Sequence, residues 1–142
     1  MILSLKSTAF ALLAVVVTNA RAETHTVTFN NNCGFGTPML IQGANVLSTG
    51  GGGCGFNGEG CTMVETTLRN PPSPGAGSST DLTLIYPHAF SVTTGFGYYN
   101  GCNGAGADCT SSSCSTAFHS SGDTTVQVAC QANDVDLVVC LL

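Results

Sequence analysis

Short stretches in which apolar and polar residues alternate recur along the chain, and no stretch combines helical periodicity with good helix formers. The clearest alternation runs from residue 24 to 29, where His25, Val27 and Phe29 interleave with threonines. A period of two residues is typical of a strand with one buried face. Many short strands without helices predict an all-β protein, built as a β-sandwich. Further strands are expected at 39–42, 46–47, 62–68, 81–86, 89–93, 124–130 and 135–140.

Three loops rich in glycine, proline or small polar residues separate these strands, at 50–60, 70–79 and 95–113. Loops of this composition bury little apolar surface, so they need another constraint to be ordered. The first and the third contain cysteines, which indicates that disulfides hold them. No composition shift marks a domain boundary, and we expect a single disulfide-stapled domain.

The first 22 residues differ from the rest of the chain. Ile2–Val17 is almost entirely apolar with Lys6 near its start, and Ala20-Arg21-Ala22 matches an A-x-A cleavage site. This arrangement is typical of a secretory signal peptide, and the apolar stretch is shorter than the roughly 20 residues that span a bilayer. The sequence therefore predicts a signal peptide at residues 1–22 and one secreted, extracellular domain at residues 23–142, without a stable membrane anchor.

Charge narrows the choice of partners. Lys6 and Arg21 lie in the predicted signal peptide, so the mature domain keeps one cation, Arg69, against eight Asp and Glu, a net side-chain charge of −7. Nucleic-acid binding needs several Lys or Arg contacts to phosphates, and docking on anionic lipid needs a basic cluster. Both classes of partner are therefore excluded, and we expect a monomer.

All eight cysteines follow the predicted cleavage site. An even number of cysteines in an exported domain predicts four disulfides. The competing interpretation is a metal site that uses the three histidines as additional ligands. It is disfavoured because the chain has no C-x-x-C pair and no two histidines at metal-ligand spacing. We expect neither a metal nor another cofactor. The residues concerned are Cys33, Cys54, Cys61, Cys102, Cys109, Cys114, Cys130 and Cys140, with His25, His88 and His119.

Motifs for enzymatic chemistry are mostly missing, since the chain has no G-x-S-x-G nucleophile elbow and no phosphate-binding loop with its lysine. Catalytic residues therefore stay unassigned. Carboxylates are more informative, because glycoside hydrolysis uses two of them roughly 5–10 Å apart. The alternative is that the acids are scattered charges that keep the protein soluble. The candidates are Glu59, Glu65, Asp81 and Asp123.

Several stretches resemble, in their order along the chain, the motifs of thaumatin-like proteins. The resemblance covers most of the mature chain and is greatest to the small members found in fungi. It implies a β-sandwich core, and it implies the disulfides Cys33–Cys140, Cys54–Cys61, Cys102–Cys130 and Cys109–Cys114. The stretches are VTFNNNC at 27–33, TMVETTL at 62–68, DLTLI at 81–85, CSTAFH at 114–119 and DTTVQVAC at 123–130, followed by a strand to Cys140.

Larger members of this family hold an acidic cleft of one arginine and four acids, between the sandwich and a disulfide-rich second domain. Three of the acids match Glu65, Asp81 and Asp123, while the fourth position falls near Ser78 and no arginine matches. The resemblance therefore implies a partial cleft.

Two segments are shorter than in the family. The second domain is missing between Cys114 and Cys130, so one wall of the cleft is absent. The stretch between Cys33 and Cys54 is also short, through a true deletion or an error in the gene model. We expect the second change to remove strands and to expose a sheet edge.

The resemblance implies binding of cell-wall β-1,3-glucan through the partial cleft, with weak endo-β-1,3-glucanase activity at most. Carboxylates accept hydrogen bonds from sugar hydroxyls, and we expect Phe96, Tyr98 and Tyr99 to stack on sugar rings. The competing interpretation is that Phe96 and one tyrosine cover the core. The alternative function is a defence or effector-type secreted protein that acts on another organism's membrane or enzymes, without glucan binding.

Overall fold

Two facing β-sheets make up the fold, as the sequence predicts. The computed structural model describes residues 22–43, 45–48 and 53–141, and no helix occurs among them. Nearly all of the predicted signal peptide, residues 1–21, lies outside this description. The strands are β1 (Val27–Asn31), β2 (Leu40–Gln42), β3 (Asn45–Ser48), β4 (Met63–Thr67), β5 (Ser78–Thr83), β6 (Thr94–Tyr99), β7 (Gly106–Cys109), β8 (Ala117–Phe118), β9 (Val128–Cys130) and β10 (Asp136–Leu141).

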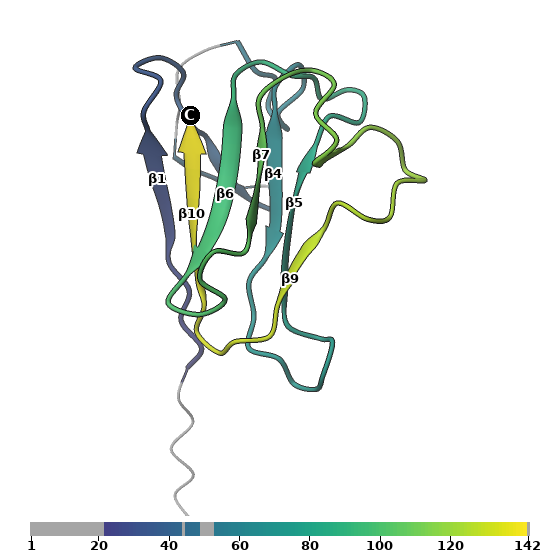
Figure 1. Cartoon of the computed structure of the whole chain (residues 1–142). Coiled ribbons are helices and arrows are strands. Elements are labelled where there is room, and N and C mark those ends of the chain that lie inside the picture. The colour runs from purple at the N-terminus through teal and green to yellow at the C-terminus, as the bar shows by residue number, and fades with distance from the viewer. Residues whose placement is uncertain (1–21, 44, 49–52, 142) are drawn as a thin grey trace, which may run out of the picture.

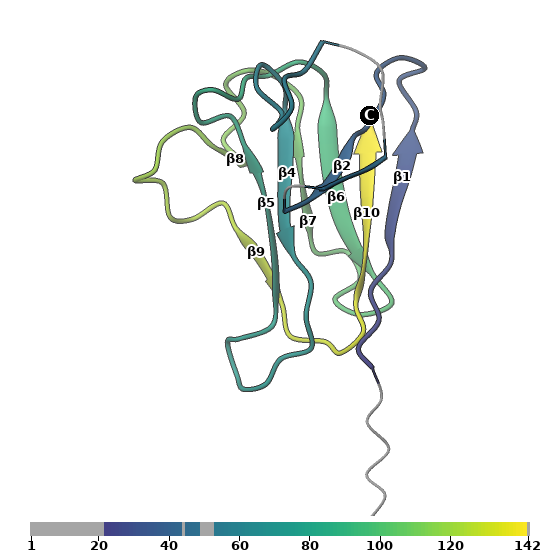
Figure 2. The ribbon, with the colours of Figure 1, turned by 180° about the vertical axis from the view of Figure 1, so that it is seen from behind.

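Strand order pairs the first and last described strands in one sheet, with β1 at its edge and β10 inside it. That sheet has the order β1-β10-β6-β7, with β10 parallel to β1 and antiparallel to β6. The opposite sheet has β5 in the middle, paired with β4 on one side and with β8 and β9 on the other. Figures 1 and 2 show the two sheets as facing layers, with the separate β2–β3 hairpin beside them.

The core lies between the layers and is small. Leu82 of β5 and Leu137 of β10 are fully buried from opposite sheets. Between them, the rings of Phe96 and Tyr98 meet edge to face with centroids 6.2 Å apart. Aromatic side chains bury much apolar area each, so two of them contribute strongly to a core without tryptophan. The remaining buried apolar residues are Cys109, Ala117, Cys130, Val135 and Val139.

Some strand predictions were wrong in position. Residues 89–93, expected as a strand, are irregular, and the strand β6 follows directly at 94–99. All of β7 and all but the first residue of β6 lie inside the segment expected to be a loop. Glycine has a packing role there: a Cβ on Gly106 would stand 2.1 Å from the Phe96 carbonyl oxygen of the neighbouring strand. Close approach of two backbones, rather than a turn, requires this glycine.

Three disulfides join residues of the described chain: Cys54–Cys61, Cys102–Cys130 and Cys109–Cys114. They indicate an oxidising, extracellular-type environment. No helix in the described part of the chain is long and apolar enough to cross a membrane.

The expected bridge between Cys33 and Cys140 is not formed. The Cα of Cys140 lies opposite that of Asn30 in the parallel pairing, three residues before Cys33. Beyond β1 the chain turns, with the Asn31 side chain accepting from the Gly34 amide and donating to the Gly36 carbonyl. Two cysteines must bring their Cα atoms within about 7 Å to be bridged. Because the register places Cys33 three residues beyond the partner of Cys140, the pairing of β1 with β10 does not bring the two cysteines opposite each other.

Candidate functional site

Two of the predicted cleft acids face each other across neighbouring strands. Glu65 of β4 pairs directly with Asp81 of β5 in the antiparallel register. Residues opposite one another in such a pair project from the same face, with Cβ atoms about 4.5–5.5 Å apart. The next pair, Val64 and Leu82, points into the core, so the two carboxylates lie on the outer face of the sheet.

Asp81 is buried although it faces outward. Only 7% of the residue is exposed, and its Oδ1 atom is buried without a hydrogen-bond partner among the described residues. The register explains the location: β8 ends opposite Thr83 and β9 begins opposite Thr80. Asp81 therefore lies at the gap where residues 119–127 leave the sheet, and Gln127 at the end of that segment acts on its carboxylate.

The environment of Asp81 favours its neutral form. Burial raises the pKa of Asp81 above its ordinary value of 3.8, and the nearby Glu65 carboxylate raises it further. A hydrogen bond from the Gln127 side chain acts in the opposite direction. Two like charges directly opposite each other on neighbouring strands are destabilising, so the Glu65–Asp81 pair lowers the free energy of unfolding when both carboxylates are ionised.

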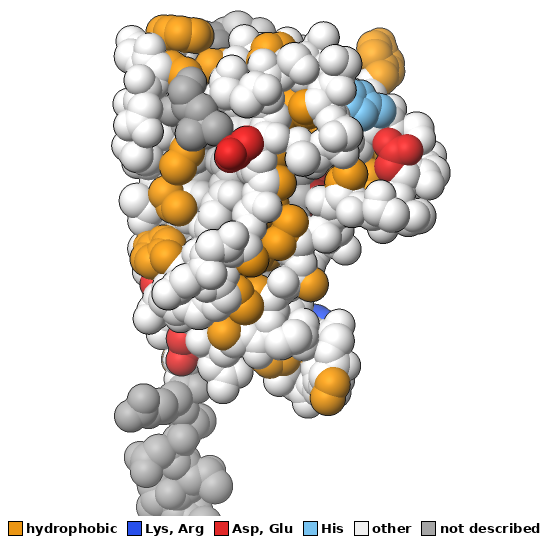
Figure 3. Space-filling model, in the orientation of Figure 1, with side chains coloured by type: hydrophobic (Ala, Val, Ile, Leu, Met, Phe, Trp, Pro, Cys, Tyr) orange, Lys and Arg blue, Asp and Glu red, His pale blue; other side chains and the backbone are white. Residues whose placement is uncertain are grey.

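A buried carboxylate oxygen without a partner lacks a hydrogen-bond donor. Leaving it unsatisfied costs about 1–3 kcal/mol or more, so it gains from a proton or from an incoming donor. Within the described residues Arg69 is the only Lys or Arg, and its Nε donates to the Ala76 carbonyl oxygen at 2.6 Å. The face in Figure 3 accordingly shows separated acidic side chains and very little positive charge. The pair is suited to neutral donors such as hydroxyl groups.

The third predicted acid, Asp123, has a different role. Its carboxylate accepts hydrogen bonds from the amides of His119 and Ser120, at 2.7 and 3.0 Å, and from the Ser120 hydroxyl at 3.0 Å. These bonds hold the pKa of Asp123 below its ordinary value, led by the amide of His119. Asp123 is also not among the groups that act on Asp81. It closes a turn in the loop that projects away from the sheets in Figure 1.

Glu59 has a comparable local role. Its Oε2 accepts from the Asn57 amide at 3.0 Å, within the loop closed by the Cys54–Cys61 disulfide. Of the four candidate acids, the structure thus brings together Glu65 and Asp81 and uses the other two in turns.

The predicted sugar-stacking residues are not available at this face. Phe96 and Tyr98 are 4% and 3% exposed and belong to the core, so the competing interpretation is confirmed for these two residues and they are not free to stack on a ligand. Tyr99 lies on the opposite sheet, where its hydroxyl contacts Thr28 Oγ1 at 3.0 Å. Successive side chains of β6 point to opposite faces of the sheet, so Phe96 and Tyr98, two residues apart, both point into the core.

Another aromatic side chain, missed from the sequence, lies near the acid pair. Phe118 is half-buried and pairs with Thr83, while its neighbour Ala117 is buried opposite Leu82. Because side chains alternate between faces, Phe118 lies on the outer face, one strand over and two residues along from Asp81. Strand β8 has only two residues, too few for an alternating pattern to predict on which face Phe118 lies.

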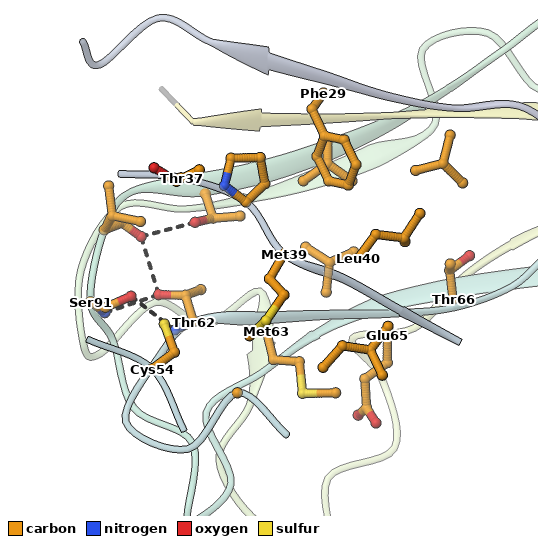
Figure 4. A pocket seen from close by; sticks show the side chains of 18 of the residues that line it. Phe29, Thr37, Met39, Leu40, Cys54, Thr62, Met63, Glu65, Thr66 and Ser91 are labelled. Carbon is orange, nitrogen blue, oxygen red and sulfur yellow. Dashed lines mark hydrogen bonds between the residues drawn. The ribbon is translucent and has the colours of Figure 1, made fainter. Parts of the chain in front are cut away.

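A cavity of about 380 Å³ lies at the open side of the sandwich. Its walls are the edge strands β1 and β4, with β10 behind and the segment leading into β2 across the opening (Figures 2 and 4). This is the location where the sequence predicts lost strands and an exposed edge. The apolar lining residues are Val27, Phe29, Pro38, Met39, Leu40, Ile41, Met63, Val64, Val92, Leu137 and Val139.

Comparisons with known proteins leave the family open. No protein-family model, no curated protein and no solved structure matches the chain. The thaumatin-like resemblance therefore stays a prediction that rests on the quoted motifs. Among the residues that the structure describes, no group of three or more His, Cys, Asp or Glu is placed to hold a metal ion.

Proposed function

We propose that this chain is a secreted thaumatin-like protein that binds cell-wall β-1,3-glucan through the outer face of β4, β5 and β8. The observation that carries the proposal is the Glu65–Asp81 pair, with the Oδ1 atom of Asp81 buried and lacking a donor. A glucan offers many hydroxyl donors and no charge. Its hydroxyl groups can donate to the exposed Glu65 carboxylate beside Asp81 without requiring a cation from the ligand.

The surroundings of the pair support a sugar ligand. Phe118 lies on the same face, and an aromatic ring packs well against the apolar face of a pyranose. Glu65 itself is exposed, so an extended chain can reach it from solvent.

Efficient hydrolysis is not part of the proposal. The raised pKa of Asp81 would suit a general acid, and Glu65 lies at about the spacing of a second carboxylate. However, Glu65 is exposed on an open face, so water is not excluded from the pair and its electrostatic effect is weakened. We propose binding with weak endo-β-1,3-glucanase activity at most.

The test uses the product that a eukaryotic host secretes from the full chain. Retention on insoluble β-1,3-glucan is compared with retention on chitin and cellulose. We expect preferential retention on β-1,3-glucan, and at least a tenfold loss for the double variant Glu65→Gln/Asp81→Asn. The matched control is Asp108→Asn, which removes an exposed acid from the other sheet and should bind like the parent protein.

The outcomes separate the two functions considered. Equal retention on all three polysaccharides, or indifference to the double variant, would contradict the proposed site and favour an effector-type interaction protein. Sequencing the N-terminus of the secreted product tests export separately: cleavage after Ala22 leaves Glu23 first, and intact retention in the cell would contradict secretion.

A further inference from the structure

The cavity at the open side of the sandwich combines a largely apolar wall with one polar end. Its volume of about 380 Å³ falls within the range of roughly 300–1,000 Å³ that small-molecule sites occupy. Such sites are mostly apolar with a few polar groups, which is the composition found here. The cavity shares Glu65 with the proposed glucan-binding face at its rim, but nothing in the proposed glucan binding requires its apolar interior.

The opening of the cavity is crossed by a segment that belongs to neither large sheet. Among the described strands, β2 pairs only with β3, and the residues before it carry Pro38 and Met39 over the gap between β1 and β4. Figure 4 shows Met39 extending from this segment into the space between Phe29 and Met63. Unbranched methionine side chains adapt their shape to different ligands.

The polar end is built from hydroxyl and carbonyl groups. Thr62 Oγ1 donates to the Val92 carbonyl oxygen at 3.1 Å and accepts from the Ser91 amide at 3.0 Å. Ser91 Oγ accepts from the Thr62 amide at 3.1 Å, and its own hydroxyl proton can still be donated. Thr94 Oγ1 donates to the same Val92 carbonyl at 3.0 Å. This end therefore offers neutral hydrogen-bonding partners at a defined position.

The charges that line the cavity favour a neutral over an anionic head group on an apolar ligand. The lining contains no Lys or Arg among the described residues, and Glu65 contributes a carboxylate to the rim on the side away from Phe29 (Figure 4). A fatty acid would bring a second carboxylate without a counter-charge, which costs free energy on partial burial. A neutral hydroxyl head group avoids this cost and matches the Thr62–Ser91 end.

We infer that the cavity beneath the segment leading into β2 is a binding site for a neutral hydroxylated lipid. The apolar part of the ligand lies between β1, β10 and β4, and its hydroxyl group lies at Thr62 and Ser91. Burial of the apolar chain provides the affinity, because the walls are apolar on both sides.

The direct test uses the fluorescence of N-phenyl-1-naphthylamine, a neutral apolar probe, with the secreted protein. We expect saturable fluorescence enhancement at one site for each chain, reversed by 1-dodecanol. Dodecanoate, which has the same chain length with an anionic head, should compete at least tenfold less well. Failure of the probe to bind, or equal competition by the alcohol and the carboxylate, would overturn the inference.

Two substitutions at one position locate the site. Met39→Trp fills the cavity, and we expect it to weaken binding of the probe at least tenfold. Met39→Lys places a cation in the lining, and we expect dodecanoate to become the better competitor. The matched controls are Phe35→Trp and Phe35→Lys, at a residue that is 65% exposed and outside the lining.

The controls also guard against loss of folding. All four variants are compared by thermal midpoint and near-ultraviolet circular dichroism before binding is measured. Parent-like binding of both Met39 variants in their folded state would place the ligand elsewhere and overturn the inference. A reversal of preference in Met39→Lys, absent from Phe35→Lys, would support it whatever the effect of tryptophan.

Discussion

The two faces of β5 differ in whether their buried polar groups have hydrogen-bond partners. On the inner face, Thr80 is fully buried and Ser78 is 1% exposed, and each has partners. Thr80 Oγ1 contacts the Tyr98 hydroxyl at 2.8 Å, and Ser78 Oγ accepts from the Arg69 amide at 2.9 Å. On the outer face, Asp81 is buried to a similar extent and its Oδ1 atom has none among the described residues.

This difference separates buried polar groups whose hydrogen bonds hold the fold from a buried carboxylate oxygen that the fold leaves without a donor. Buried polar atoms in folded proteins nearly always have a hydrogen-bond partner, and a charged one without a partner is costly. Thr80 and Ser78 follow this rule and link the sheet to the core. Asp81, on the outer face of the same strand, keeps one buried oxygen without a hydrogen-bond partner. The exception is therefore confined to the outer face, which supports the proposed binding site there.

The largest effect should come from breaking the inner-face network. Tyr98→Phe removes the hydroxyl that contacts Thr80 Oγ1 at 2.8 Å and the Val128 carbonyl oxygen at 3.0 Å. Buried partners are then left unsatisfied, so we expect a loss of about 1–3 kcal/mol in the free energy of unfolding. Urea unfolding of the purified protein measures it.

The control for this substitution is Tyr99→Phe, on the next residue of β6. The Tyr99 hydroxyl contacts Thr28 Oγ1 in an exposed position, where water can replace it. We expect a change within about 0.5 kcal/mol. Equal costs for the two variants would show that the inner-face network does not contribute in the way proposed.

The second prediction concerns the outer face and has the opposite sign. Asp81→Asn removes a buried charge beside Glu65, so at pH 7 we expect an unchanged or higher free energy of unfolding, by up to about 1 kcal/mol, together with the loss of glucan retention. A stability loss like that of Tyr98→Phe would mean that Asp81 is structural and has a partner in solution.

The pH dependence of stability sharpens this prediction. Because the pKa of Asp81 is raised above 3.8 in the folded protein, the folded state holds the proton more tightly than the unfolded state. The contribution of Asp81 is therefore most favourable below pH 3.8, and it declines as the pH rises through the folded-state pKa. The stability gain of Asp81→Asn over the parent should be absent near pH 3 and grow toward neutral pH.

Alternation predicted the strands whose side chains are large and regularly spaced, as in 135–140. It missed β6, because Gly95 and Gly97 between the aromatic residues resemble a loop. The constraint on Gly95 became visible only with β7 alongside, because a Cβ there would meet the Asp108 side chain and lie 3.2 Å from the Ala107 carbonyl oxygen. Contacts of this kind join residues distant in sequence and leave no local signal.

The candidate site was predictable in part for the same reason. The resemblance placed Glu65 and Asp81 on strands, and pairing of those strands suffices to bring their side chains together. The burial of Asp81 depends on where β8 ends and β9 begins, which no pattern in 114–130 specifies. The turn at Asp123, by contrast, is local, and the sequence Ser-Ser-Gly-Asp is typical of a turn closed by an aspartate.

The smallest effect should come from this turn, and it completes the contrast with Asp81. The pKa of Asp123 is lowered, so its contribution to stability is present above pH 3.8 and is lost as the pH falls through the folded-state pKa, opposite in sign to Asp81. Asp123→Asn weakens the acceptor for the His119 and Ser120 amides, and we expect these two amides to exchange with deuterium several-fold faster while that of Leu82 does not change. Glucan retention should stay at the parent level, because the Asp123 carboxylate is bonded within its own turn and does not take part in the proposed binding site. A loss of retention would contradict this and support a role of Asp123 in the cleft.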